Sequence, residues 1–211
     1  MKGNIFSIAV TGHRPKKLYG YNLYDPRWIQ LAKIMRRYLL RKEREKGCLE
    51  CVSGMALGVD QLFALVALKL RDDGHAVKVL CALPCRDQNK AWKDDLWWRD
   101  IMRRADERFF VHDGLYTRSC MTDRNKWMAD RADEILAVWD GSCGGTGHCV
   151  KYALEKNVPV INIFGGIEVE LKQAGERYGK FRDETQDCPR EKGEAHARAG
   201  RISGNFRPPS L

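Results

Sequence analysis

Short apolar runs alternate with amphipathic helical patterns along most of this chain. The runs cover residues 5–10, 49–53, 77–83, 109–111, 134–139 and 158–164, and apolar residues recur at helical spacing over 28–47, 60–70, 87–105, 121–132 and 150–156. Strands that alternate with helices form parallel sheets, with right-handed crossovers and helices on both faces. The sequence therefore predicts an α/β fold: a Rossmann-like, doubly wound, mostly parallel sheet with helices on both faces.

The last part of the chain departs from this pattern. At 211 residues the chain is longer than one typical domain but too short for two, so we expect one domain over 1–166 and a C-terminal segment, 167–211. Residues 168–178 have a helical pattern, and the chain from Arg182 onward is polar and basic. Two interpretations stay open for this segment: a flexible tail, or an arm that packs on a neighbouring subunit or on nucleic acid.

Composition narrows the class of protein further. No apolar run is long enough to span a bilayer and no secretory signal is recognisable, so we expect a cytoplasmic protein without a membrane partner. The net charge of +9 favours anionic partners, whether nucleotides, nucleic acids or acidic proteins. The eight cysteines include a single C-x-x-C pair, Cys48 and Cys51, so we interpret all of them as thiols and predict no metal site.

A glycine-rich stretch, 139–148, separates the apolar run at 134–139 from the helical pattern at 150–156. This order aims unpaired backbone N–H groups at an anion, because a helix N-terminus carries about +0.5 of a charge and glycine permits close approach. The candidate ligand residues of this stretch are Asp140, Gly144, Gly145, Thr146, Gly147 and His148. The alternative is a surface turn that binds nothing.

Other loops that follow apolar runs carry side chains suited to a nucleotide. Arg14 and Arg124 can pair with phosphate, and Asn125 offers an amide to a base or phosphate. Asp60 can accept from ribose hydroxyls, or it can simply cap the helix that begins beside it. Because the carboxyl ends of parallel strands meet at one edge of a sheet, these loops are expected to converge there.

Three more side chains are assigned to that edge. Gln88 and Trp92 stand at i, i+4 spacing on the helix predicted over 87–105, and Trp92 either stacks on a base or belongs to the core. His13 is expected to flank the pocket opposite His148. For both histidines a hydrogen-bonding or structural role is preferred over acid–base work.

The ordered set of motifs resembles the YpsA-type branch of the SLOG superfamily, which also includes DprA and the LOG-type phosphoribohydrolases. The resemblance covers residues 5–164 and implies a sheet that binds nucleotides or nucleotide-derived small molecules, in proteins that commonly form homo-oligomers. The residues that carry it are Thr11-Gly12-His13-Arg14-Pro15, then Ser53, Gly54, Gly58, Val59 and Asp60, then Pro84, Gln88 and Trp92, and finally Arg124, Asn125 and Met128. On this basis Thr11, Gly12, Gly54, Gly58 and Pro84 join the expected ligand residues.

One position departs from the enzymes of the superfamily. LOG-type hydrolases resemble this chain at Gly145-Thr146 but have a catalytic glutamate three residues after the threonine, where this chain has Cys149. A thiol is a poor substitute for a carboxylate in glycosidic cleavage. We therefore expect a non-catalytic binder of a nucleotide-derived ligand, such as an ADP-ribose derivative or a cyclic nucleotide signal, with no resident cofactor. The alternatives are LOG-type hydrolysis, with Asp60 or Asp140 in place of the glutamate, and DprA-like binding of nucleic acid.

Overall fold

The computed structural model describes residues 5–22, 25–92 and 96–166. Its strands are β1 (Phe6–Gly12), β2 (Leu49–Ser53), β3 (Val77–Leu83), β4 (Glu107–Phe110), β5 (Glu134–Val138) and β6 (Val160–Asn162). Its helices are the short 3-10 helix η1 (Pro15–Lys17), α1 (Pro26–Lys46), α2 (Val59–Asp72), α3 (Leu96–Arg104), α4 (Cys120–Arg131) and α5 (Gly145–Glu155). The predicted C-terminal helix and basic tail lie outside the described residues.

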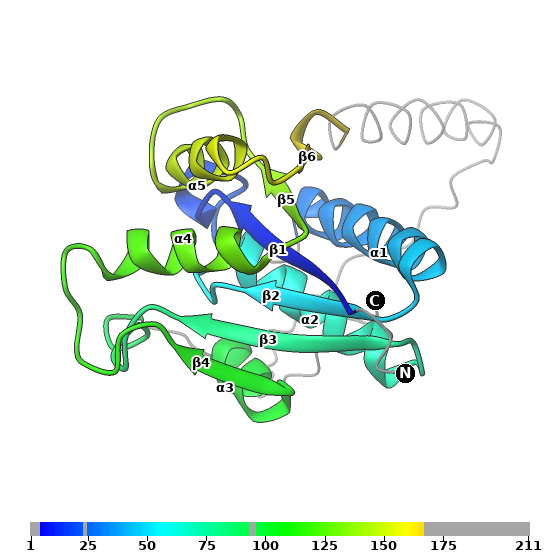
Figure 1. The fold of residues 1–211 in the computed structure, drawn as a ribbon, viewed down its shortest axis with the longest axis horizontal. Coiled ribbons are helices and arrows are strands. Elements are labelled where there is room, and N and C mark those ends of the chain that lie inside the picture. The colour runs from blue at the N-terminus through cyan, green and yellow to red at the C-terminus, as the bar shows by residue number, and fades with distance from the viewer. Residues whose placement is uncertain (1–4, 23–24, 93–95, 167–211) are drawn as a thin grey trace, which may run out of the picture.

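All strands of the described part form one sheet, in the order β4-β3-β2-β1-β5-β6, and every neighbouring pair is parallel. The predicted Rossmann-like α/β fold is therefore confirmed. From β1 the chain builds the sheet outward through β2, β3 and β4, and it then returns to the other side of β1 with β5. This reversal is a topological switch point, where the loops after two adjacent strands diverge and leave room for a ligand. In Figure 1 the arrowheads of β1 to β4 point left, toward the edge where these loops lie.

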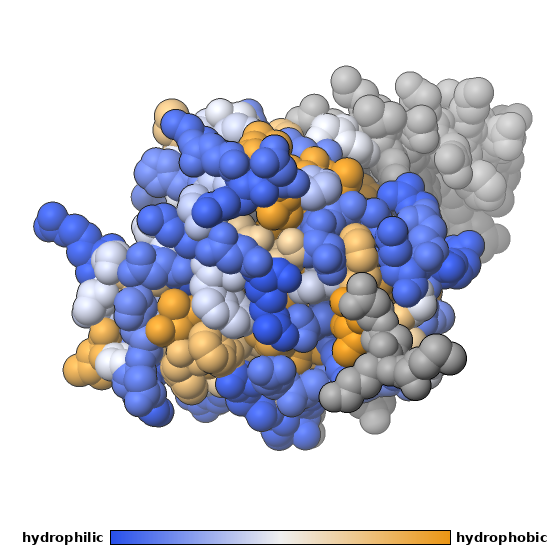
Figure 2. Space-filling model, viewed as in Figure 1, coloured by the Kyte–Doolittle hydropathy of each residue, from blue (hydrophilic) through white to orange (hydrophobic). Residues whose placement is uncertain are grey.

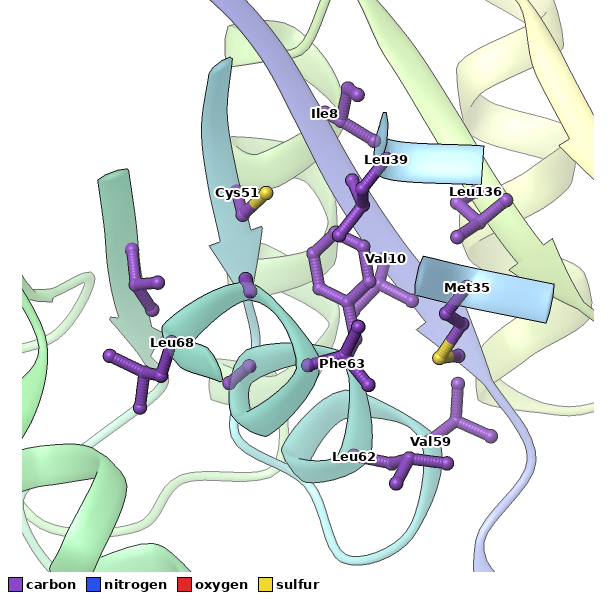
Figure 3. Packing of buried hydrophobic residues seen from close by; sticks show 14 of the residues in the cluster. Ile8, Val10, Met35, Leu39, Cys51, Val59, Leu62, Phe63, Leu68 and Leu136 are labelled. Atoms are coloured by element: carbon purple, nitrogen blue, oxygen red, sulfur yellow. The ribbon is translucent and has the colours of Figure 1, made fainter. Parts of the chain in front are cut away.

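The alternation of side chains along β1 divides the interior into two cores. Ile8 and Val10 belong to the larger core, which α1, α2 and α3 complete, whereas Ala9 packs with α4 and α5 on the other face. Figure 3 shows Phe63 of α2 lying among residues of β1 and α1 in the larger core, where it is fully buried. Burying such a side chain contributes about 1.5–3 kcal/mol, so this face holds the sheet edge rigidly for the loops beyond it.

Two predicted helices differ from the elements of the structure. The helix predicted over 150–156 begins at Gly145, so the glycines after position 144 form its first turn and not a loop. Within the helix predicted over 87–105, residues 86–91 form turns, and α3 covers Leu96–Arg104. In the turns Arg86 donates its backbone N–H to the carbonyl of Gly114 (3.0 Å), and the Asp87 carboxylate accepts from the N–H of Tyr116 (2.8 Å). These bonds tie the segment to the loop after β4.

Among the described residues, no helix is both long enough and apolar enough to cross a membrane. On the face shown in Figure 2, hydrophobic residues form separate areas surrounded by hydrophilic ones. The visible part of α1 is covered by hydrophilic residues.

Candidate functional site

The loops after β1 and β5 meet at the switch point. The N–H of His13 donates to the carbonyl of Val138 at 3.3 Å, which extends the pairing of β1 with β5 by one residue. Beyond it the His13 imidazole Nε2 lies 2.6 Å from Oδ1 of Asp140. His13 is only 5% exposed, so it links the two loops from the protein interior and does not face solvent. The structural role preferred for this histidine fits its position.

Asp140 also organises the loop that follows β5. Its Oδ1 accepts from the N–H of Ser142 (2.9 Å) and from the Ser142 hydroxyl (2.5 Å). The indole N–H of Trp139 donates to the carbonyl of Ser142 (2.7 Å), and Lys17 Nζ donates to the Ser142 hydroxyl (2.6 Å). The bonds from Ser142, and then the bond from His13, hold the pKa of Asp140 far below its usual range. The hydrogen bonds of this carboxylate hold the loop after β5 in its conformation.

Acid is therefore expected to loosen this loop. Because the folded-state pKa of Asp140 is depressed, its stabilising effect is present above the unfolded-state pKa of about 3.9 and is lost as the pH falls below that value. The indole N–H signal of Trp139 in two-dimensional NMR should shift on acidification, while that of Trp28, bonded to the Gly20 carbonyl, serves as the internal control. Asp140→Asn should give the shifted Trp139 signal already at neutral pH. An unchanged Trp139 signal in this variant would contradict the assigned role.

The N-terminus of α5 presents free backbone donors. Its first helical bond runs from the N–H of His148 to the carbonyl of Gly144 (2.9 Å), so the N–H groups of Gly145, Thr146 and Gly147 have no partner among the described residues. Gly144 adopts φ 140°, a conformation that side chains disfavour. A Cβ added at Gly145 would meet nothing within 4 Å. The start of α5 thus presents backbone donors to its surroundings, and they belong to a helix start and not to a loop.

A buried ion pair stands behind the loop after β2. Nη1 of Arg124, on α4, lies 3.3 Å from Oδ2 of Asp60, in the first turn of α2, and both residues are 5% exposed. The same carboxylate oxygen accepts from the N–H of Ala56 (3.2 Å). Gly54 is required here, because a Cβ at this position would lie 1.4 Å from Nη1 of Arg124. Arg124, Asp60 and Gly54 are thus one cluster, as their predicted convergence requires.

The charges of this cluster influence one another. Burial raises the pKa of Asp60, and the positive charges of Arg124 and Arg14 oppose the rise. Arg14 itself is exposed at the start of η1, and its side chain has no hydrogen-bond partner among the described residues. Arg124 is therefore a structural cation that neutralises a buried acid, whereas Arg14 is a free cation at the mouth of the switch point.

Gln88 and Trp92 do not share a helix face, and this prediction was wrong. Both lie in the segment that follows the buried Pro84, where residues 86–91 form turns, with a bond from the N–H of Trp92 to the carbonyl of Asn89 (2.9 Å). Gln88 is nevertheless at the site, since its Nε2 donates to the carbonyl of Gly54 at 3.0 Å. Trp92 is half-buried.

The start of α5 is also tied to α4 and β1. Nδ2 of Asn125 donates to the carbonyl of Gly145 at 3.3 Å, which occupies part of the amide that we assigned to a ligand. Cys149 is 2% exposed, and burial raises the pKa of its thiol, opposed by a hydrogen bond with Thr11. A thiol with a raised pKa is neither a nucleophile nor a general acid of useful strength at neutral pH.

Gly12 and Gly58 are needed for close packing at the same edge. A Cβ at Gly12 would lie 2.5 Å from the side chain of Val59, and Gly58 has φ +95° against the ring of Pro15. Both glycines thus allow β1 to approach the start of α2. Thr146 is buried beside Cys149, whereas His148 is exposed.

Two surface hollows lie along α5. The larger, of about 770 Å³, is lined by the loop 139–144 and by residues from Gly147 to Glu155, and the smaller, of about 280 Å³, lies between α4 and α5. His148 lines both. Neither hollow includes Arg14, Gly54 or Arg124. We therefore define the site by the unpaired N–H groups at the start of α5 and by its arginines, and not by the hollows.

Two residues of the site were missed from the sequence. Lys17 and Ser142 bond each other across 125 positions, and neither belongs to a motif that separates it from an ordinary surface lysine or serine. No cluster of three or more His, Cys, Asp or Glu side chains suited to a metal occurs in the described ranges. The seven cysteines in those ranges are free thiols.

With this geometry in view, comparison with known proteins gives the family. The sequence pattern of the YspA SLOG family matches residues 8–159, which is well over half of the chain. The chain belongs to this family. The predicted resemblance is confirmed, and the matched range spans the sheet from β1 through α5.

Individual relatives agree with the assignment. The chain is similar to the uncharacterized SPbeta prophage-derived protein YoqJ of Bacillus subtilis, at 31% identity over 48% of this chain and 67% of that protein. It is also similar to a UPF0398 protein of Pediococcus pentosaceus, at 25% identity over 63% of this chain and 74% of that protein.

Solved structures of similar fold are DNA processing proteins. DprA of Streptococcus pneumoniae superposes with a TM-score of 0.55 at 18% identity, over 81% of this chain but only 57% of that protein. DprA of Helicobacter pylori, described in a single-stranded DNA binding mode, gives 0.53 at 15% identity, over 80% of this chain and 81% of that one. At such identities the likeness concerns the fold.

Proposed function

We propose that this YspA SLOG protein binds a nucleotide-derived small molecule without cleaving it, an ADP-ribose derivative or a cyclic nucleotide signal being the kind of ligand expected. The observation that carries the proposal is the set of three unpaired N–H groups at the start of α5, placed beside the switch point between β1 and β5. Helix N-termini in this position bind phosphate in doubly wound folds.

The charges around the site support an anionic ligand. Arg14 is exposed and its side chain has no bond to another residue of the described ranges, so it can pair with a phosphate without breaking such a contact. The nearest acids are already engaged: Asp140 by Ser142 and His13, and Asp60 by Arg124. A phosphate at α5 therefore meets donors and a cation. Asp60 is paired with Arg124, and Oδ1 of Asp140, which stays ionised, is already bonded to Ser142 and His13.

The same engagement favours binding over catalysis. The buried thiol of Cys149 stands where LOG-type hydrolases have a glutamate, and the hydrolase alternative needs Asp60 or Asp140 as a replacement. Asp60 is buried and accepts from Ala56, whereas the Asp140 side chain is 33% exposed and has its Oδ1 bonded to Ser142 and His13. Release of free base from a nucleoside monophosphate at high protein concentration, abolished by Asp60→Asn or Asp140→Asn, would overturn the non-catalytic assignment.

A charge placed at Gly145 tests the anion site directly. Gly145→Asp puts a carboxylate into open space at the first position of α5, where an acid favours the helix by about 0.3–1 kcal/mol. The variant should therefore melt no lower than the parent, while its affinity for ADP or ADP-ribose, measured by calorimetry, falls by about tenfold or more because like charges repel.

The matched control is Gly145→Asn, which has the same shape without the charge. Asparagine should weaken binding clearly less than aspartate does. Equal losses in the two variants would mean that no anion sits at α5. Mass spectrometry of ligand retained through purification identifies the natural molecule, and a folded protein that binds none of a broad nucleotide panel would refute the proposal.

Nucleic-acid binding is a second candidate, favoured by the outer face of α1. Exposed Lys33, Arg37, Arg41 and Arg44 recur there about once per helical turn. The DprA proteins, one of which binds single-stranded DNA, share the fold. Affinity for single-stranded DNA that falls steeply with salt would support this candidate, since each neutralised phosphate releases counterions. Binding restricted to short nucleotides would exclude it.

A further inference from the structure

Two buried polar atoms at the carboxyl edge of the sheet have no hydrogen-bond partner in the part of the chain that the structure describes. They are Oε1 of Gln88 and Nε of Arg124, on side chains that belong to residues 7% and 5% exposed. A buried donor or acceptor left unpaired costs about 1–3 kcal/mol, so native proteins rarely keep two in one place. We therefore looked for a ligand group that could bond to both of these unpaired atoms.

Both side chains converge on Gly54, directly after β2. Nε2 of Gln88 donates to the Gly54 carbonyl at 3.0 Å, and since a carbonyl can only accept, the amide oxygen of Gln88 must point elsewhere. On the other side of Gly54 the guanidinium of Arg124 fills the space that a Cβ would take. Its Nη1 is used by Asp60, which leaves Nε free. The free acceptor and the free donor therefore adjoin one glycine.

We propose that this pair binds a ribose hydroxyl of the ligand, so that the site selects ribonucleotides over deoxyribonucleotides. A hydroxyl donates one proton and accepts at its lone pairs, and so it can satisfy Gln88 Oε1 and Arg124 Nε together. A phosphate offers no donor to Gln88, and an aliphatic group satisfies neither atom. The inference rests on the proposed function, because the phosphate at α5 brings the sugar to this edge.

Entry of a hydroxyl requires a small opening of the cluster, since neither atom is exposed. The segment that carries Gln88 is suited to move: residues 86–91 form turns, and the tertiary bonds of Arg86 and Asp87 go to the exposed loop after β4. A ligand anchored by its phosphate can drive this opening, whereas a single water has no such anchor.

The test compares ADP with 2′-deoxy-ADP and 3′-deoxy-ADP by calorimetry on the full chain. We expect one of the deoxy compounds to bind about tenfold or more weakly than ADP, because the missing hydroxyl leaves both protein atoms unpaired. Equal affinities for all three would overturn the subsite while leaving the proposed function standing. If none of the three binds and ADP-ribose does not bind either, the proposed function fails and the subsite fails with it.

A variant pair assigns the selectivity to Gln88. Gln88→Met removes the acceptor and keeps a side chain of similar length. The variant should bind ADP only as tightly as the parent binds the weaker of the two deoxy compounds, and its affinity for that deoxy compound should not change. Gln61→Met is the matched control, because buried Gln61 donates to the Met55 carbonyl (3.4 Å) in the same loop and has no unpaired buried atom. This control should keep the discrimination. Loss of discrimination in both variants, or in neither, would remove Gln88 from the subsite.

Discussion

Replacing Gly54 with alanine is expected to destabilise the protein by about 3 kcal/mol and to abolish ligand binding. The added Cβ would lie 1.4 Å from Nη1 and 2.3 Å from Cζ of Arg124, so the guanidinium must leave its place. An arginine end group is flexible, but this one is buried and paired with Asp60, and a displaced partner leaves the acid alone in the interior. Chemical denaturation measures the loss of stability, and calorimetry with ADP measures the loss of binding.

Gly114→Ala provides the control for this experiment. Gly114 lies in the loop after β4, and a Cβ there would meet nothing within 4 Å. The change should stay within about 0.5 kcal/mol of the parent, as surface substitutions usually do. If Gly54→Ala is as stable as Gly114→Ala, Arg124 does not depend on its place against Gly54.

The sheet could be predicted from the sequence because its signal is local. Apolar runs such as those at 77–83 and 134–138 are buried on both faces, and their composition alone distinguishes them from the amphipathic helices between them. The start of α5 and the turns at 86–91 could not be predicted. Gly145 to His148 lack a helical pattern, and the turns at 86–91 bond to residues 27–29 positions later.

The site shows the same division. Its arginines and glycines could be proposed because strand-end loops of a parallel sheet meet at one edge. Their partners could not, since the Arg124–Asp60 pair joins residues 64 positions apart and depends on how α4 packs. Asp140 illustrates the limit most clearly: the sequence offers it to a ligand, and the structure places its carboxylate on Ser142 and His13.

The two halves of the site differ in kind. At α5 a side chain added at Gly145 enters open space, so the donors there can be tested by adding a charge. Around Gly54 the polar atoms are buried, so a substitution there also changes the stability of the protein. A loss of binding in Gly54→Ala can therefore be interpreted only together with a second variant that breaks the Arg124–Asp60 ion pair and leaves Gly54 in place. Arg124 supplies that variant.

Arg124→Met is expected to lower the free energy of unfolding by about 3–5 kcal/mol at neutral pH, because it leaves a buried carboxylate without its counter-charge. A second substitution, Asp60→Asn, should recover most of this loss, since it removes the charge that the first change left unpaired. Urea denaturation of the parent, both single variants and the double variant gives the coupling energy directly. A double variant no more stable than Arg124→Met would show that the pair is not the source of the loss.

The pH dependence follows from the same carboxylate. Burial already raises the pKa of Asp60, and the cation of Arg124 opposes the rise, so Arg124→Met should raise it further. A raised folded-state pKa means that the stabilising protonated form is fully present below the unfolded pKa of about 3.9 and is lost as the pH rises through the folded value. The deficit of Arg124→Met should therefore shrink as the pH falls from neutral toward the unfolded pKa of about 3.9, and the double variant should show no such trend. A deficit that stays constant over this range would place the missing interaction in the packing of the arginine and not in its charge.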